Sequence, residues 1–238
     1  MVSTAVAPPD RTGHRIVAPL WHTLVVLFIL LTLSLLSARS HSPSGLGQSR
    51  TRIANYLTVM AVEWGVVAFI WFGIRIRGVQ MRDLVGGAWP NWVAALRDLG
   101  ITILFLVAAN LVLALMGFLL RVAPNQAIRN IFPQGRTEIA LYLVLALTAG
   151  ICEEIIFRGY LQKQFAGITG SAGWGLVIQG IAFGAAHGYQ GPKFMAIIAV
   201  YGCLFGLLAL WRRSLRPGMM SHFLHDGIIG LVGRHLIR

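Results

Sequence analysis

Apolar residues gather in long runs along the chain, and short polar, glycine- or proline-containing segments separate them. The first run, 20–38, exceeds the apolar core of about 7–15 residues of a secretory signal, and Leu36-Ser37-Ala38 is a poor cleavage site. We therefore predict a retained transmembrane helix. Further runs follow at about 53–74, 99–120, 138–160, 173–187, 194–211 and 217–233. About 20 apolar residues cross a bilayer, so the fifth and seventh runs are short. The pattern predicts an all-α, multi-pass membrane helical bundle with about seven transmembrane helices, within a range of six to eight.

Composition supports a protein surrounded by lipid. Hydrophobic residues make up 56% of the 238 residues and charged residues 12%, whereas soluble domains carry about 25% charged residues. The net charge of +12 comes from arginines scattered singly between apolar runs, which is typical of anchoring to anionic head groups. We expect the lipid bilayer as a partner and no nucleic acid. Two cysteines in apolar runs exclude a disulfide framework.

The distribution of basic residues predicts the orientation. Residues 1–19 are polar and are expected to form a cytoplasmic tail. With the N-terminus inside, ten Lys and Arg residues fall in cytoplasmic segments and seven fall in outer loops, or nine with the two nearest the C-terminus. Because cytoplasmic loops carry an excess of basic residues, this bias favours an N-terminus in the cytoplasm.

Ionisable residues inside the apolar runs are the candidates for chemistry. The chain has eight acidic residues, and four of them lie within apolar runs: Glu63, Glu153, Glu154 and Asp226. Facing lipid alone, the last three together with Arg158 would cost on the order of 10 kcal/mol. We therefore expect them to face one another or a hydrated cavity. Glu63 stands apart in sequence. We expect it either to have a structural role, paired with an arginine or near a helix end, or to join the hydrated cavity. His22, near the start of the first run, is expected at the membrane interface.

Helical spacing divides these residues into roles. Glu154 and Arg158 are four apart and can pair on one face, while Glu153 is rotated by about 100° and is free of that pair. A carboxylate in such a site can act as a general base. His187 ends the fifth run, and His222 and Asp226 are four apart near the start of the seventh.

Two chemistries fit this set. In the first, Glu153 takes a proton from a water molecule held by His187, and His222 with Asp226 stabilises the oxyanion. In the second, Zn²⁺ is bound by ligands drawn from Glu153, His187, His222 and Asp226, and the metal activates its bound water. Both are peptide hydrolysis within a membrane.

The three motifs together resemble a known family. The patterns Glu153-Glu154-x-x-x-Arg158, Phe183-x-x-x-His187 and His222-x-x-x-Asp226 are similar to those of the CAAX-protease and bacteriocin-processing family of intramembrane proteases (CPBP or Abi, type II CAAX prenyl endopeptidase-like). The resemblance covers about residues 137–235. It divides the chain into variable N-terminal transmembrane segments, 20–136, and a catalytic core, 137–238.

The resemblance also implies roles for the site residues. Glu153 would be the water-activating base, with His187, Glu154 and Arg158 as supports and His222 near the oxyanion. Members of the family are called metalloproteases. The position of Asp226 is often Asn in the family, so Asp226 is either protonated, or orients His222 from behind, or binds a metal.

These observations lead to one preferred function and two alternatives. We expect a hydrolase, an intramembrane endopeptidase of bacterial type in the cell membrane, that cuts a peptide or a membrane-protein segment near the bilayer surface. A prenylated CAAX substrate is implied by the family name only. A proton- or metal-coupled transporter is an alternative, because such relays also use intramembrane carboxylates and histidines. A non-enzymatic scaffold or immunity protein is the other.

Overall fold

The structure is a computed structural model that describes residues 15–39, 48–122 and 126–236. All regular secondary structure within these ranges is helical. The elements in chain order are α1 (Leu20–Arg39), α2 (Gln48–Ile76), α3 (Met81–Val85), α4 (Trp92–Leu119), α5 (Gln126–Ile131), α6 (Arg136–Glu153), η1 (Glu154–Leu161), α7 (Gln162–Thr169), α8 (Ala172–Ala186), η2 (Gly188–Gln190), α9 (Pro192–Arg212) and α10 (Arg216–Leu236).

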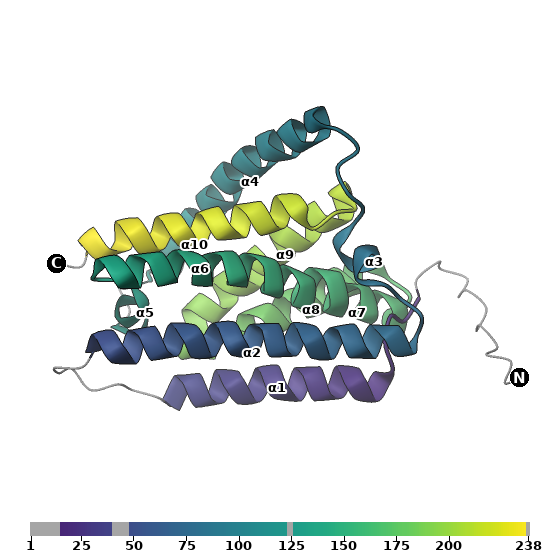
Figure 1. Ribbon diagram of the computed structural model, residues 1–238, viewed down its shortest axis with the longest axis horizontal. Coiled ribbons are helices and arrows are strands. Elements are labelled where there is room, and N and C mark those ends of the chain that lie inside the picture. Colours follow the sequence, from purple (N-terminus) through teal and green to yellow (C-terminus); the bar gives the residue numbers. More distant parts are fainter. Residues whose placement is uncertain (1–14, 40–47, 123–125, 237–238) are drawn as a thin grey trace, which may run out of the picture.

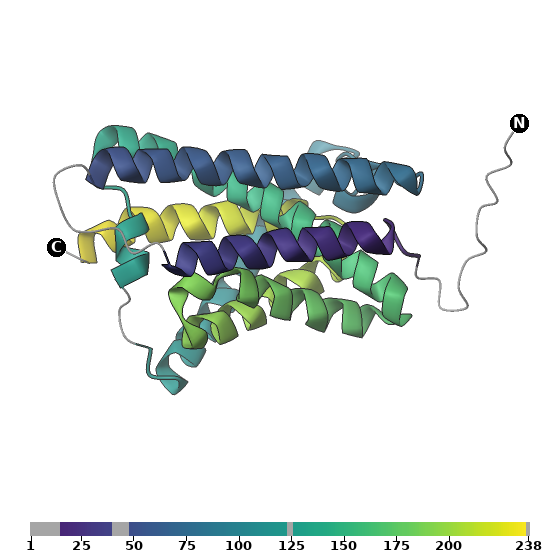
Figure 2. The same cartoon turned by 90° about the horizontal axis from the view of Figure 1, so that it is seen from below.

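The long helices lie roughly along one direction (Figure 1). Helix α6 packs against α2 on one side and α10 on the other, and α8 packs against α9 and α7. Seen from below, α1 runs across the bundle, and it contacts α8 and η2 (Figure 2). Helix α4 contacts α10 and α9 but leans away from the other helices. The core therefore lies between α1, α2, the α6–α7 segment and α8–α10.

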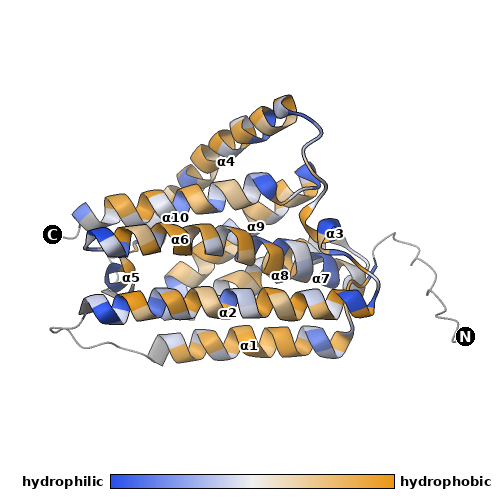
Figure 3. Ribbon diagram, in the orientation of Figure 1, coloured by the Kyte–Doolittle hydropathy of each residue, from blue (hydrophilic) through white to orange (hydrophobic). Residues whose placement is uncertain are grey.

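The chain is a multi-pass membrane protein. Five described segments are long and apolar enough to cross a bilayer: Leu20–Ser37, Ser49–Ile76, Trp92–Leu119, Arg136–Thr169 and Pro192–Arg212. Helix α8 is apolar but has 15 residues, as the short fifth run predicted. Helix α10 has 21 residues but is not among the five, because its polar side chains include those of the cluster described below. Apolar residues dominate the middle of the long helices in Figure 3.

The fourth span is longer than its apolar run indicated. Helices α6, η1 and α7 join into one segment of 34 residues, and its middle part, η1, is a π-helix. The backbone N–H of Gln162 donates to the carbonyl of Phe157, five residues earlier, instead of four as in an α-helix. Glu153 and Glu154 lie at the junction between α6 and η1, near the middle of this span.

The end of the predicted tail is packed against the bundle. Residues 1–14 of that tail lie outside the described residues. Val17 and Ala18 are buried, and their backbone N–H groups donate to Oε1 of Gln164 on α7 at 2.8 and 3.0 Å. Gln164 Nε2 donates back to the Ala18 carbonyl at 2.9 Å. This pairing fixes where the chain enters α1.

The prediction for His22 is wrong, because its side chain is fully buried instead of interfacial. Nε2 of His22 lies 2.9 Å from the Phe69 carbonyl on α2, and Nδ1 lies 2.8 Å from the hydroxyl of Tyr160 on η1. A carbonyl only accepts, so Nε2–H donates and Nδ1 accepts from Tyr160. The ring thus ties α1 to α2 and η1. Its position in sequence near a helix end did not reveal these distant partners.

The close approach of His22 to α2 requires a glycine, which gives a testable prediction. A Cβ at Gly73 would lie 2.3–2.5 Å from three atoms of the imidazole. We expect Gly73→Ala to destabilise the protein by about 1–3 kcal/mol, the usual cost of overpacking a filled core. The measurement is the apparent melting temperature in detergent. Gly65→Ala on the same helix is the matched control, since no atom lies within 4 Å of its Cβ. Equal effects of the two changes would contradict the packing of His22.

Candidate active site

Glu154 and Arg158 form a buried ion pair at the centre of the bundle. Glu154 Oε1 lies 3.0 Å from Arg158 Nη1, and the two side chains are 1% and 0% exposed. Arg158 Nη2 also donates to the Gly202 carbonyl on α9 at 3.4 Å. The guanidinium carbon lies 4.2 Å from the centroid of the Phe183 ring and 5.0 Å from that of Phe205. The sequence predicted this pair, and the aromatic surroundings exclude water from it.

His222 on α10 lies next to three carboxylate groups. Its Nδ1 lies 3.2 Å from Oε1 of Glu154, and its Nε2 lies 3.6 Å from Oε2 of Glu153 and 3.6 Å from Oδ2 of Asp226. Glu154 therefore holds the imidazole from behind, while Glu153 and Asp226 both lie on the Nε2 side. One of the three roles left open for Asp226 was to hold His222 at the ring nitrogen that faces away from the site. Glu154 occupies that place, at Nδ1.

The two adjacent glutamates have different surroundings. The Glu154 side chain is 1% exposed and bound to both Arg158 and His222, whereas the Glu153 side chain is 18% exposed. Oε2 of each glutamate has no hydrogen-bond partner among the described residues, so the difference lies in the ion pair and the exposure. The separation of a carboxylate in the ion pair from one outside it is the division that helical spacing indicated. Glu153 is also the more exposed of the two.

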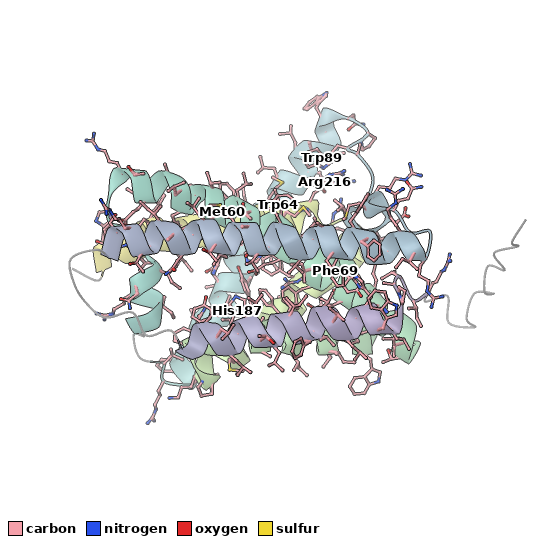
Figure 4. The ribbon with its side chains drawn as sticks, turned by 60° about the horizontal axis from the view of Figure 1, so that its bottom comes forward. Met60, Trp64, Phe69, Trp89, His187 and Arg216 are labelled. Carbon is pink, nitrogen blue, oxygen red and sulfur yellow. The ribbon has the colours of Figure 1, made fainter. Side chains whose placement is uncertain are left out.

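His187 lies at the C-terminal end of α8 (labelled in Figure 4). Its Nδ1 lies 2.9 Å from the Phe183 carbonyl. Because a carbonyl only accepts, Nδ1 carries the hydrogen, and Nε2 of the neutral ring keeps a lone pair. The Phe183 ring lies between the histidines, with its centroid 4.8 Å from that of His187 and 6.1 Å from that of His222. His187 also interacts electrostatically with Asp226.

Glu63 on α2 lies with this cluster. Of the two alternatives for Glu63, it therefore joins the other carboxylates and does not pair with any arginine that the structure describes. Its carboxyl group lies within hydrogen-bond reach of Glu153 and interacts electrostatically with His222 and Asp226. Oε2 of Glu63, like Oε2 of Glu153, has no hydrogen-bond partner among the described residues. Its depth in an apolar run was the available signal. That signal did not tell which way α2 is turned about its axis.

All four intramembrane acids thus converge with Arg158 and two histidines. They come from α2, the α6–η1 junction and α10, and His187 comes from α8. Asp226 is partly exposed, with 32% of its side chain accessible. Such an arrangement can remove a proton at Glu153 and stabilise a negative charge at His222.

A bound metal ion is the second chemistry that the motif residues were expected to support. Within the part of the chain that the structure describes, no three His, Cys, Asp or Glu side chains are arranged to hold one. Nδ1 of His187 and Nδ1 of His222 are both engaged by protein oxygens, so Nε2 is the ring atom that either histidine would offer to a metal. The zinc alternative therefore stays a prediction, and no step below is routed through a metal.

Comparison with known proteins connects this site to a family. Residues 135–228 match the family described as Rce1-like, type II CAAX prenyl endopeptidase Rce1-like. Comparisons with curated proteins and with solved structures gave no match. The matched residues include Glu153, Glu154, Arg158, His187 and the motif that begins at His222. The segment 135–228 is thus similar to the Rce1-like type II CAAX prenyl endopeptidase family, as its three motifs indicated.

Proposed function

We propose that this protein is an intramembrane endopeptidase that hydrolyses a peptide bond with a water molecule activated by Glu153. The observation that carries the proposal is the contrast between the two adjacent glutamates. Glu154 is buried and held by Arg158 and His222, whereas Glu153 is outside the ion pair, is 18% exposed and lies beside Nε2 of the same histidine. A carboxylate outside an ion pair and beside a hydrogen-bond donor is what general-base hydrolysis needs.

The chemistry can be followed atom by atom. The Glu153 carboxylate takes one proton from water, the water oxygen bonds to the carbonyl carbon, and the carbonyl oxygen becomes an oxyanion. Nε2 of His187 accepts a hydrogen bond from the second proton of the water. When His222 carries both protons, Nδ1–H donates to Glu154 and Nε2–H donates to the oxyanion. The tetrahedral intermediate then breaks its C–N bond, and Glu153 returns the proton to the departing amine.

Asp226 has a further part in this scheme. Together with Glu153 it faces Nε2 of His222, so it keeps that N–H directed into the site when no substrate is bound. The developing oxyanion then takes the place of these carboxylates as the hydrogen-bond acceptor. This differs from a motif that ends in Asn, whose amide could donate to the oxyanion directly.

The substrate and the location follow from where the site lies. It lies within the membrane-spanning helices, so we propose a peptide or a membrane-protein segment as the substrate. Arg–Trp contacts gather at the end of the molecule where α1 begins: Arg75 over Trp71, Arg212 over Trp211, and Arg216 over Trp89, of which the last pair is labelled in Figure 4. Such pairs suit an interface with anionic head groups. We place this end, and the N-terminus, in the cytoplasm of a bacterial-type cell.

One experiment separates the proposal from its alternatives. The purified protein is reconstituted in vesicles and incubated with three substrates: unprenylated peptides, prenylated CAAX peptides and a single-span protein. Products are identified by mass spectrometry, and bound metal is measured in the same sample. New termini at an internal peptide bond support the proposal. Ion flux without cleavage would favour the transporter, and neither activity would favour the scaffold. Cleavage that requires stoichiometric zinc would replace the metal-free scheme.

A further inference from the structure

A serine on the first helix is bound to the turn that carries His187. Ser34 lies on α1, and 5% of it is exposed. Its Oγ donates to the Ala185 carbonyl at 2.7 Å and accepts from the Gly188 N–H at 3.1 Å. One hydroxyl therefore binds a peptide group on each side of His187.

These two hydrogen bonds complete a helix end that α8 cannot complete alone. The last carbonyls of an α-helix have no partner within the helix. At the end of α8 the Phe183 carbonyl accepts from Nδ1 of His187, and the Gly184 carbonyl accepts from the His187 N–H. Ser34 supplies the donor for Ala185, and it also satisfies the Gly188 N–H. The backbone on both sides of His187 is thus fixed by α1.

The fit between the hydroxyl and the turn is close. A Cβ at Gly188 would lie 2.7 Å from Ser34 Oγ, which is shorter than Cβ atoms tolerate. The pairing of a small polar residue on α1 with a glycine after His187 is therefore a specific contact.

From this geometry we infer that Ser34 is a positioning residue for His187. Its hydroxyl holds the turn so that Nδ1–H reaches the Phe183 carbonyl and the Nε2 lone pair faces the site. The use of that lone pair to hold water rests on the proposed function, whereas the positioning does not. Ser34 lies outside the family match at 135–228, so the site is completed by a helix that the match does not cover.

The first test compares Ser34→Ala with Ser34→Thr, which keeps the hydroxyl. Thr58→Ala is the matched control, since Thr58 is exposed on α2. We expect Ser34→Ala to lower kcat by about 10- to 100-fold with little change in KM, because the substrate still binds while His187 is misplaced. Ser34→Thr should recover most of the rate. A loss confined to KM, or a Ser34→Ala enzyme as active as the control, would overturn the inference.

The second test reads His187 directly and needs no activity. In protein labelled with ¹⁵N at histidine, the two ring nitrogens give distinct signals, and the His187 signals are assigned by their loss in His187→Gln. We expect them to report Nδ1–H in the parent protein and to shift or broaden in Ser34→Ala. The His22 signals serve as an internal reference for the fold. Unchanged His187 signals in Ser34→Ala would overturn the positioning role.

A double-mutant cycle measures the contact between Ser34 and Gly188 directly, so that it can be distinguished from a general loss of folding. Gly188→Ala places its Cβ against Ser34 Oγ, so it should lower the melting temperature of the parent protein. In the Ser34→Ala background that oxygen is absent, and the same change should cost clearly less. Additive effects would contradict the contact. If the parent protein cleaves nothing in any assay, the proposed function fails, and the spectra and this cycle still decide the role of Ser34.

Discussion

The Glu153→Gln variant is expected to lose between about 100- and 10,000-fold of the cleavage rate while folding like the parent protein. Gln has nearly the same shape as Glu but cannot accept the proton of water. The Glu153 side chain is 18% exposed, and its Oε2 makes no hydrogen bond among the described residues, so the change removes little that stabilises the fold. The measurement is turnover of a peptide in detergent or vesicles, together with the melting temperature.

Two further variants make this result specific. Asp83→Asn makes the same carboxylate-to-amide change at an exposed position on α3 and should keep the parent rate. Glu154→Gln should lose both rate and stability, because Glu154 binds Arg158 and His222. Parent turnover by well-folded Glu153→Gln would exclude Glu153 as the base.

Arg158→Leu is expected to produce the largest loss of stability, about 3–5 kcal/mol, because it leaves the buried Glu154 carboxylate without its cation. Arg158 also donates to the Gly202 carbonyl and lies over the Phe183 and Phe205 rings. The variant therefore loses contacts to α8 and α9 as well as the ion pair. The free energy of unfolding in mixed micelles measures the effect.

The double variant Arg158→Leu with Glu154→Leu separates charge from packing. With both charges removed, no buried ion is left unpaired, and much of the lost stability should return. Activity should not return, because His222 then lacks the carboxylate that holds its Nδ1. Arg52→Leu is a comparison, since it breaks a less buried ion pair with Glu138 in the first turn of α6. Its loss of stability should be smaller. A double variant no more stable than Arg158→Leu alone would contradict this account of the pair.

Much of the architecture could be predicted because it depends on local properties of the chain. The length of an apolar run decides whether a helix can cross a bilayer, so the runs near 20–38, 53–74 and 99–120 correspond to α1, α2 and α4. A spacing of four residues brings side chains together on one helix, and Glu154 and Arg158 do lie 3.0 Å apart. The family resemblance was carried by the same local spacings.

Other features of the site could not be predicted in this way. The π-helix of η1 changes the helical turn directly after Glu153, and the apolar run predicted only a continuous helix there. His22 was expected at the interface, but partners 47 and 138 residues away bury it. Glu63 was left between two roles because the direction in which α2 presents it depends on how α2 packs against α6.

The sequence by itself determined that the chain crosses the membrane many times and that Glu154 pairs with Arg158 while Glu153 lies outside that pair. These properties follow from run length and helical spacing, which act over a few residues. Only the tertiary structure decided that Glu154 holds His222 from behind, that Glu63 joins the carboxylates and that Ser34 fixes the turn of His187. The reason is physical: such contacts depend on the rotation and depth of each helix against its neighbours, and packing of the whole bundle sets both.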